Sequence, residues 1–293
     1  MHTDRYSKPS FKLGLHHHST RSDGRLSPEE IAEKYSCAGY DAIAITDHWV
    51  FGNEVVVNGF PVLSGCEYHT GIRDGNEGVY HILCLMPDRE PQLDCSMSPQ
   101  QIIDGIHAAG GLAILAHPAW SLNSPEKIKA LRDLDGVEIF NTVSERGNSR
   151  RGDSSLLVDL LASEGYFYPL LAADDSHFYE ATGNFADSCT AFIVVSCDTL
   201  TPTAIKSAIR EGHFYASTGP EIHMSVENGI ARVNCSNASE IVFLSNFVYM
   251  NNRVITGENL TYGEYAIQPG ETYIRAYVTD SLGRRAWSCP VKL

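Results

Sequence analysis

Residues 11–24, FKLGLHHHSTRSDG, are the segment that decides the fold. The segment starts as a short apolar run of strand length and ends that run in three consecutive histidines. In an extended strand, side chains two residues apart leave the same face, so His16 and His18 point one way while His17 points the other. Two imidazoles on one face have the geometry of a chelating pair. The segment therefore predicts a strand whose C-terminal end carries metal ligands.

Further apolar runs of strand length occur along the chain, with helical segments between them. Four helix starts place a capping hydroxyl before a proline at the first helical position: Ser27-Pro28, Ser98-Pro99, Ser124-Pro125 and Thr201-Pro202. Alternation of strand-like and helical segments is typical of a parallel α/β sheet or barrel. The later apolar runs are DAIAIT, PVLSGCEYH, YHILCLM, LAILAHP, GVEIFN, YPLLAADD and AFIVVS.

The C-terminal part of the chain has a different pattern. From about Gly219 the helical period disappears, and short alternating segments such as EIHMSVE and TYIRAYVTD are separated by Asn, Gly and Asp turns. This pattern predicts a small antiparallel β-module. We therefore divide the chain into an α/β domain over residues 1–218 and a β-module over residues 219–293.

The charge balance limits the partners. Among 293 residues, 36 Asp and Glu stand against 22 Lys and Arg, which gives a net charge of -14. Such a field repels extended nucleic acid, whereas small phosphate compounds remain candidates because metal ions or a few arginines can reverse the field locally. No apolar run approaches the roughly 18 residues that a membrane span needs. Without an apolar leader near the start, and with eight scattered cysteines expected to be reduced, we predict a cytoplasmic protein in which a homo-oligomer is compatible with the sequence.

Histidine and carboxylate side chains collect at the predicted strand ends. In a (β/α) barrel the active site is built at the C-terminal ends of the strands and from the loops that follow. A single histidine there is more commonly a structural residue, but a series in strand order favours a metal centre. Imidazole and carboxylate ligands without thiolate suit Zn, Mn or Fe, and the set is too large for one ion, so we expect two or three divalent ions. The candidate ligands are His16, His18, Asp23, His48, Glu67, His81, His117, Asp175 and His177.

The segments that carry these residues resemble the successive motifs of the PHP superfamily, the polymerase and histidinol phosphatase domain. The resemblance covers about residues 11–215 and rests on LGLHHHSTRSDG, AIAITDHW, GCEYH, YHILCL, AILAHPAW and AADDSHF. It implies a distorted (β/α)7 barrel with a two- or three-metal site that acts on phosphate esters. It also implies three ligand sets: His16, His18, Glu67 and Asp175 for one ion, Glu67, His81 and His117 for a second, and Asp23, His48 and His177 for a third.

Such a centre predicts hydrolysis by a hydroxide that bridges two ions. The ions lower the pKa of bound water and neutralise charge on the phosphate oxygens during in-line attack. We assign the bridging role to Glu67 and place Asp175 and His177 beside it as catalytic residues. Asp47 and Asp174 each precede a ligand in the chain, and we expect them to support the ligands, with Asp47 orienting the histidine that follows it.

Substrate contacts are predicted in two loops. The segment NTVSERGNSRRGD follows a predicted strand and carries Arg146, Arg150 and Arg151, whose guanidinium groups suit a phosphate. The alternative is that these arginines are solvated surface charges. His213 lies in the junction GHFYAS, which could fold over the barrel mouth, so it is a further candidate contact.

These observations favour a metal-dependent phosphoesterase, a phosphoric ester hydrolase that releases phosphate from a small soluble monoester. A nucleotide or a nucleoside bisphosphate is among the candidate substrates. A phosphodiesterase or exonuclease on short oligonucleotides ranks lower, because the sequence shows no basic track. A non-phosphate hydrolase of the amidohydrolase kind and a metal-stabilised binding module are the remaining alternatives, since metal chemistry alone does not name the electrophile.

Overall fold

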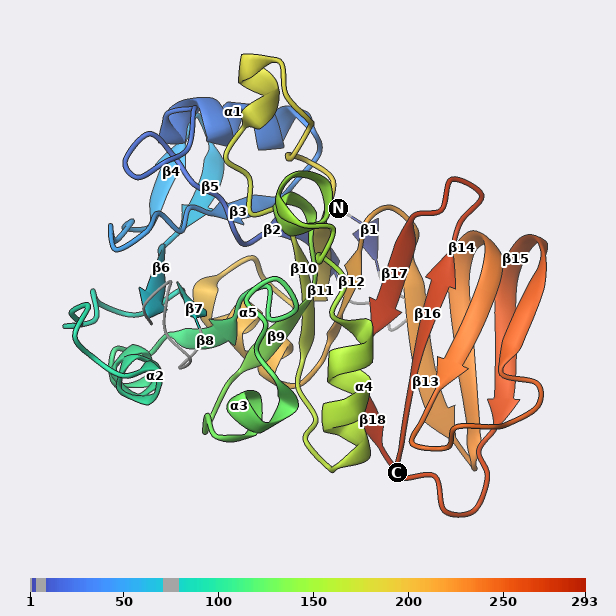
Figure 1. Cartoon of the computed structure of the whole chain (residues 1–293). Coiled ribbons are helices and arrows are strands. Elements are labelled where there is room, and N and C mark those ends of the chain that lie inside the picture. The colour runs from blue at the N-terminus through green and yellow to red at the C-terminus, as the bar shows by residue number, and fades with distance from the viewer. Residues whose placement is uncertain (1, 4–8, 71–78) are drawn as a thin grey trace.

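The computed structural model describes residues 2–3, 9–70 and 79–293 of the chain. Figure 1 shows short strands and helices arranged around the N-terminal part, and a layer of long strands from the C-terminal part beside them. Within the described ranges, no helix is both long enough and apolar enough to cross a membrane. The strands form two sheets, one of 13 strands and one of five.

The 13-stranded sheet runs through both parts of the chain. In its N-terminal half, β2 pairs parallel with β3, and β3 pairs parallel with β5. On the other side of β2, β11 and then β12 continue the sheet in the antiparallel sense. The bounds are β1 (His2–Thr3), β2 (Pro9–Gly14), β3 (Ala42–Ala44), β4 (Val55–Val57), β5 (Phe60–Leu63), β11 (Phe192–Ser196) and β12 (Phe214–Ser217).

The five-stranded sheet has the order β10-β9-β8-β7-β6. Its strands β8, β9 and β10 are parallel, as the alternation of strands and helices predicts, whereas β6, β7 and β8 pair antiparallel. Most of its side chains are buried, which explains the continuous apolar runs in the sequence. The bounds are β6 (Gly65–Thr70), β7 (Tyr80–Leu85), β8 (Leu112–Leu115), β9 (Gly136–Asn141) and β10 (Leu170–Ala173).

The α/β class is confirmed, but the expected (β/α)7 barrel is not closed. Over the described residues the two sheets stay open. Isolated bridges, among them His17 with Ser176 and His48 with Glu67, join the ends of β2 and β3 in the larger sheet to the two edge strands of the smaller one. The chain passes from the first sheet to the second between β5 and β6, where a side chain in place of Gly65 would lie 2.9 Å from Thr46 Cγ2. Because β6 and β7 are antiparallel, this part of the ring lacks the β-α-β unit that the barrel prediction assumed.

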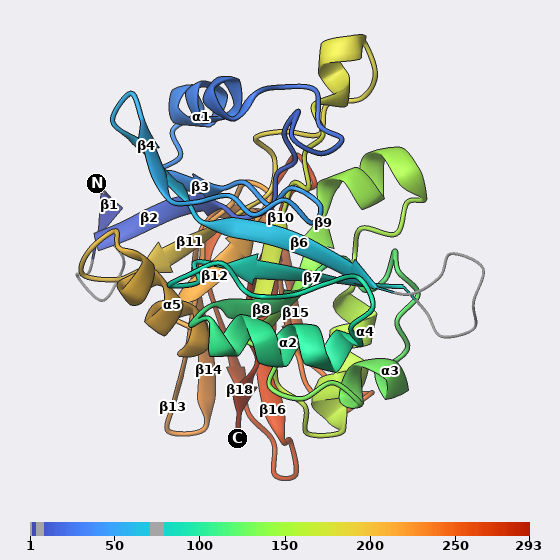
Figure 2. The ribbon, with the colours of Figure 1, turned by 90° about the vertical axis from the view of Figure 1, so that its left-hand side faces the viewer.

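Helices cover the outside of this ring, and Figure 2 shows α2 beside β7 and β8 and α1 beside β3. The four predicted caps are confirmed: each Ser or Thr before the proline accepts a hydrogen bond from a backbone N–H in the first turn. Two short irregular helices follow β9 and β10. The bounds are α1 (Pro28–Cys37), α2 (Pro99–Ala108), α3 (Pro125–Lys129), the π-helix η1 (Ser144–Asn148), α4 (Ser155–Ser163), the 3-10 helix η2 (Tyr179–Thr182) and α5 (Pro202–Arg210).

The C-terminal strands are antiparallel, as their alternating pattern predicts. They have an apolar core of their own, with Phe243 and Val278 fully buried. They also continue the larger sheet, because β17 pairs with β12, and Trp287 of β17 belongs to the core of the N-terminal part. Strands on the two sides of the proposed division near residue 218 are therefore paired with each other, and the division itself falls between β12 and β13. The bounds are β13 (Ile222–Glu227), β14 (Ile230–Leu244), β15 (Val254–Ala266), β16 (Tyr273–Thr279), β17 (Arg285–Ser288) and β18 (Val291–Lys292).

Candidate metal centre

Four of the candidate ligands form a fully buried group where the two sheets meet. His16 and His18 follow β2, Glu67 lies on β6, and Asp175 follows β10. His16 Nε2 lies 3.3 Å from Glu67 Oε2 and 3.2 Å from Asp175 Oδ1. His18 Nε2 lies 3.1 Å and 3.0 Å from the same two oxygens. One donor atom from each residue fits within 4.8 Å of the others, which is the spacing of a metal site.

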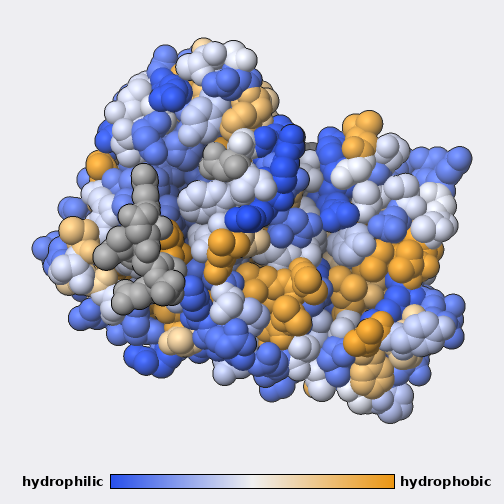
Figure 3. All heavy atoms as spheres, in the orientation of Figure 1, coloured by the Kyte–Doolittle hydropathy of each residue, from blue (hydrophilic) through white to orange (hydrophobic). Residues whose placement is uncertain are grey.

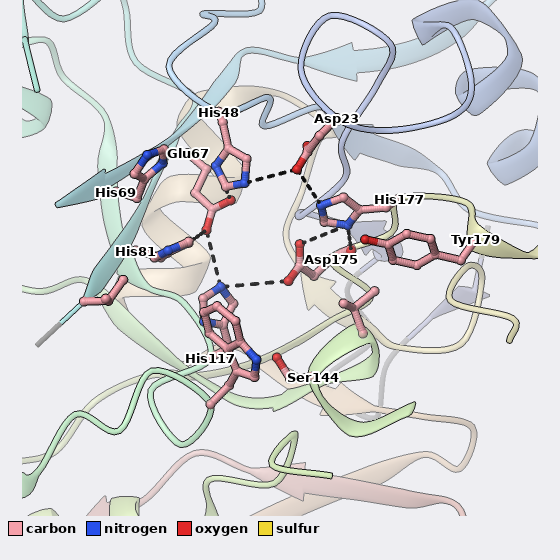
Figure 4. Close-up of a pocket in the computed structure, with 13 residues that line it drawn as sticks. Asp23, His48, Glu67, His69, His81, His117, Ser144, Asp175, His177 and Tyr179 are labelled. Carbon is pink, nitrogen blue, oxygen red and sulfur yellow. Dashed lines mark hydrogen bonds and ion pairs between the residues drawn. The ribbon is translucent and has the colours of Figure 1, made fainter. Parts of the chain in front are cut away.

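Two further groups adjoin the first. Figure 4 shows the side chains of Asp23, His48, Glu67, His81 and His177 around one hollow. One joins His18, Asp23, His48 and His177, with His177 Nε2 3.4 Å from Asp23 Oδ2. The other joins His48 and Glu67 with the histidine of β7, His81.

The ligand sets differ in detail from those that the family resemblance implies. His18 belongs to two groups, and His48 lies with Glu67 as well as with Asp23. His117 is outside the compact groups, although its Nε2 lies 3.4 Å from Glu67 Oε1.

Glu67 connects these groups through its two oxygens. Oε2 faces His16, His18 and His48, with His48 Nδ1 at 3.2 Å. Oε1 faces His81 at 2.7 Å and His117 at 3.4 Å. One carboxylate thus lies between two clusters of imidazoles, as a bridging ligand would.

The electrostatics of the cluster favour the binding of positive charge. Burial raises the pKa of the Glu67 carboxyl, but the charges of His16 and His81 outweigh burial and hold that pKa well below its usual range. Burial lowers the pKa of His18, but hydrogen bonds to Asp175 and Glu67 outweigh burial and raise the pKa to about 9. Burial lowers the pKa of His48 to about 4, which keeps this imidazole neutral. The carboxylates therefore stay ionised and attract positive charge, which divalent ions would supply.

The donor atoms also fit metal ions. Three buried polar atoms of the cluster, His18 Nδ1, His48 Nδ1 and Glu67 Oε2, lack a well-oriented hydrogen bond within the described residues, although Glu67 Oε2 and His48 Nδ1 lie 3.2 Å apart. Buried polar atoms are normally hydrogen-bonded, so three such atoms in one hollow are unusual. Imidazole nitrogens and carboxylate oxygens are the ligands of Zn, Mn and Fe. The clusters are therefore consistent with several divalent ions.

Backbone strain marks the same hollow. Asp175 and His117 have φ angles of +53° and +26°. Side chains other than glycine rarely adopt positive φ, and such conformations cluster at functional sites where the surrounding structure imposes them. Both candidate ligands thus occupy backbone positions that the fold holds against local preference.

Asp47 supports the centre differently from our expectation. Its carboxylate accepts hydrogen bonds from Ser19 N at 2.7 Å, from Ser19 Oγ at 2.6 Å and from Ser22 Oγ at 2.6 Å. It therefore fixes the loop that carries Asp23. We expected Asp47 to orient His48, but the described structure has no hydrogen bond between their side chains. The carboxylate oxygens of Asp47 bind these hydroxyl and amide groups instead.

Asp174 lies outside the three compact ligand groups, beside the ligand Asp175. It is fully buried and accepts hydrogen bonds from Tyr35 Oη at 2.7 Å, from Thr190 Oγ1 at 2.6 Å and from Ala191 N at 2.8 Å. These contacts hold the end of β10 against the segment that leads into β11.

Glu138 is a supporting residue that the sequence analysis missed. This buried carboxylate lies 2.8 Å from His16 Nδ1 and accepts hydrogen bonds from His117 N at 2.8 Å and Asn141 Nδ2 at 2.9 Å. Asn141 Nδ2 also donates to Asp175 Oδ2 at 3.3 Å. Such partners fix the orientation of ligand side chains. The available signal was a carboxylate inside the otherwise apolar strand GVEIFN.

His69 is a second residue that sequence reasoning passed over. It lies two positions after Glu67 on β6, so its side chain leaves the same face of the strand. Its ring packs against His48 at 5.0 Å and against His81 at 5.4 Å between ring centroids. The spacing that identified the first histidine pair would have identified this pair as well.

The ligands open into a hollow of about 420 Å³. Trp120 and Tyr179 form parts of its wall, and the Tyr179 ring stacks on His177 with centroids 5.4 Å apart. Val143 and Ser144, at the start of η1, form another part. The hollow is large enough for a small ligand.

The predicted substrate contacts do not line this hollow. Arg146 and Arg150 lie in a second hollow, and Arg151 is exposed outside both. The reason is local: Ser144 faces the metal ligands, whereas the turn of η1 carries Arg146 to the opposite side. His213 lies at a third hollow of about 450 Å³.

Comparison with known proteins identifies the fold. In sequence, the chain matches no family model and no curated protein. In structure, it resembles a two-domain protein from Bacteroides vulgatus that contains a predicted PHP-like metal-dependent phosphoesterase. The TM-score is 0.54 at 13% identity, and the match covers 98% of this chain and 95% of that one.

Two weaker likenesses cover part of the chain. A candidate metal-dependent phosphoesterase from Bifidobacterium adolescentis has a TM-score of 0.42 at 15% identity, covering 58% of this chain and 89% of that one. An amidohydrolase from Chromobacterium violaceum, solved with sulfate and without metal, has a TM-score of 0.41 at 16% identity, covering 56% and 87%. The predicted resemblance to PHP-like proteins is thus confirmed as a likeness of fold, over nearly the whole chain, to the Bacteroides protein.

Proposed function

We propose that this protein is a metal-dependent phosphoesterase that hydrolyses a small soluble phosphate monoester. The observation that carries the proposal is the arrangement of three adjoining ligand groups, two of which share the buried carboxylate of Glu67 and connect to the third through His18 and His48. The PHP-like fold supports the same class of reaction.

The metal ions would be held by the nine predicted ligands. We assign two or three ions of Mn, Fe or Zn to the three groups. His117, which lies beside Glu67 Oε1, would be a further ligand. Divalent ions bound there would lower the pKa of a coordinated water and polarise a phosphoryl oxygen.

The hollow itself favours a substrate that binds through metal ions. Its described lining contains neither lysine nor arginine, so the charge of a phosphate group has no side-chain cation to meet. Asp175 and His177 line the hollow together with Glu67. His177 Nδ1 lies 2.8 Å from the backbone oxygen of Asp175. Trp120 and Tyr179 supply flat surfaces against the organic part of a substrate, for which a nucleotide or nucleoside bisphosphate is our candidate.

The acidic chain favours small partners over polymers. We propose a cytoplasmic enzyme that acts on a soluble compound and not on extended nucleic acid or a membrane, in a monomer or a homo-oligomer. Short oligonucleotides are the alternative substrates.

Phosphate release from a panel of sugar phosphates, nucleoside monophosphates, 3′,5′-bisphosphates and short oligonucleotides, with Mn added, tests the proposal. We expect one small compound to release phosphate and Glu67→Gln to abolish this release. Glu54→Gln is the matched control, because Glu54 is exposed and belongs neither to the ligand groups nor to the lining of the hollow. Absence of phosphate release from protein shown to carry its metals, together with cleavage of an amide panel, would replace the phosphoesterase with an amidohydrolase.

A further inference from the structure

A second hollow, of about 770 Å³, lies where the N-terminal part meets the C-terminal strands, and we call it the junction hollow. It is lined by β2, the segment around η1, β11 and the turn before β17. Figure 3 shows strongly hydrophilic side chains on both sides of the notch between these two parts. Five of the lining residues are cationic: Lys12, Arg146, Arg150, Arg284 and Arg285.

The junction hollow is positive in a chain of net charge -14. Its two lining carboxylates, Glu145 and Asp153, leave a local charge of 5 − 2 = +3, and Asp280 behind Arg284 reduces this to +2. Both lining carboxylates have partners already. Glu145 Oε2 accepts from Gly152 N at 3.1 Å, and Asp153 Oδ2 pairs with Arg285 Nη1 at 3.1 Å.

Three of the cations have no carboxylate partner among the described residues. Arg146 Nη1 donates only to the backbone oxygen of Ala186 at 2.9 Å, and Arg150 makes no side-chain hydrogen bond within the described structure. Lys12 Nζ lies 4.0 Å from the ring centroid of Tyr40 and 4.3 Å from that of Phe192, and burial lowers its pKa. Arg146 and Arg150 are exposed and Lys12 is half-buried. Cations gathered in one hollow without counter-charges favour the approach of an anion.

The floor of the junction hollow is aromatic. Phe140 and Trp287 stack with ring centroids 5.6 Å apart, and Phe192 lies in the same lining. Trp287 is 1% exposed, and its Nε1–H has no acceptor among the described residues. The partly buried rings of Phe140 and Phe192 give the hollow an aromatic surface for the organic part of a ligand.

We propose that the junction hollow binds a small organic compound with two or more phosphate groups. Arg146 and Arg150 on one wall and Arg284 on the other would bind phosphate oxygens, and the aromatic floor would contact the organic part. This site goes beyond the proposed function. It lies on the other side of η1 from the metal centre, and it needs no hydrolysis to be detected.

Calorimetric titration of the Mn-loaded, full-length protein tests the site. The probes are pyrophosphate, which offers charge alone, and α,β-methylene-ADP, which adds an organic ring system and resists hydrolysis. We expect Arg150→Gln to weaken binding of both probes by roughly 10- to 100-fold, the effect of one charge-assisted contact. Arg151→Gln is the matched control, because Arg151 is the next residue and does not line the hollow.

The opposite wall provides an independent pair of variants. Arg284→Gln should weaken both probes, whereas Arg232→Gln, which removes an arginine that also pairs with a carboxylate on the C-terminal strands, should not. Tighter binding of the methylene-ADP than of pyrophosphate would support the role of the aromatic floor. If Arg150→Gln and Arg284→Gln, both folded by their melting temperatures, bind the probes as the unmodified protein does, the proposal is wrong.

Discussion

The metal centre and the junction hollow lie on opposite sides of the same five-residue π-helix and have opposite chemistry. One presents imidazoles and carboxylates with no lysine or arginine in its described lining, and the other presents five cations over aromatic rings. Net charge describes neither site. The two hollows therefore differ in what they need to bind an anion. The metal centre needs added cations before an anion can bind, whereas the junction hollow can hold an anion directly.

The largest effect should come from removing the charge of a buried ligand. Asp175→Asn takes one carboxylate from the fully buried group and should reduce bound metal and lower hydrolysis by more than about 100-fold, beyond the range for supporting residues. Metal content per chain and phosphate release measure the two effects. Asp135→Asn is the control, since Asp135 also contacts a histidine, His107, but belongs to none of the ligand groups. Full metal content and full activity in Asp175→Asn would remove Asp175 from the centre.

The next effect concerns the floor of the junction hollow. Trp287 is buried in the core of the N-terminal part although it belongs to the C-terminal strand β17. Trp287→Ala should lower the free energy of unfolding by about 3–5 kcal/mol because it leaves a large cavity. Urea denaturation measures this change. Tyr249→Ala should leave stability nearly unchanged, because Tyr249 is 83% exposed. Equal stability of the two variants would mean that Trp287 does not join the two parts of the chain.

A smaller effect should separate supporting residues from ligands. Glu138→Gln keeps the shape of the side chain but weakens its interactions with His16 and His117. Metal affinity or activity should fall by about 10- to 100-fold, with the fold intact. Titration of metal into the metal-free variant measures the affinity. The exposed Glu126→Gln serves as the control, and an affinity equal in both variants would show that Glu138 has no influence on the centre.

Much of the metal centre could be predicted from the sequence. His16 and His18 reveal themselves by their two-residue spacing on a strand, and the other ligands follow strand ends that a shared fold brings together. The helix caps are equally local, because a hydroxyl before a proline acts within one turn. These features depend on neighbours in the chain.

The rest depends on contacts that spacing does not encode. Nothing in YHILCLM says that β7 runs antiparallel to β6, so the open sheets could not be predicted. Arg146 lies two residues after Ser144, yet the π-helical turn directs the two side chains to different hollows. The position of Glu138 beside His16 joins residues 122 apart in the chain.

The seam between the two sheets has a consequence for how the protein assembles. The bridge between His17 and Ser176 joins residues 159 positions apart, and the members of one candidate ligand group come from both sides of this seam. An ion bound there would act as a removable cross-link that closes a long loop. The entropy lost on closing such a loop grows only slowly with its length. Because such a ligand binds only the assembled seam, the melting temperature should rise with the concentration of free metal. The chain would then be most resistant to unfolding when it is ready for catalysis.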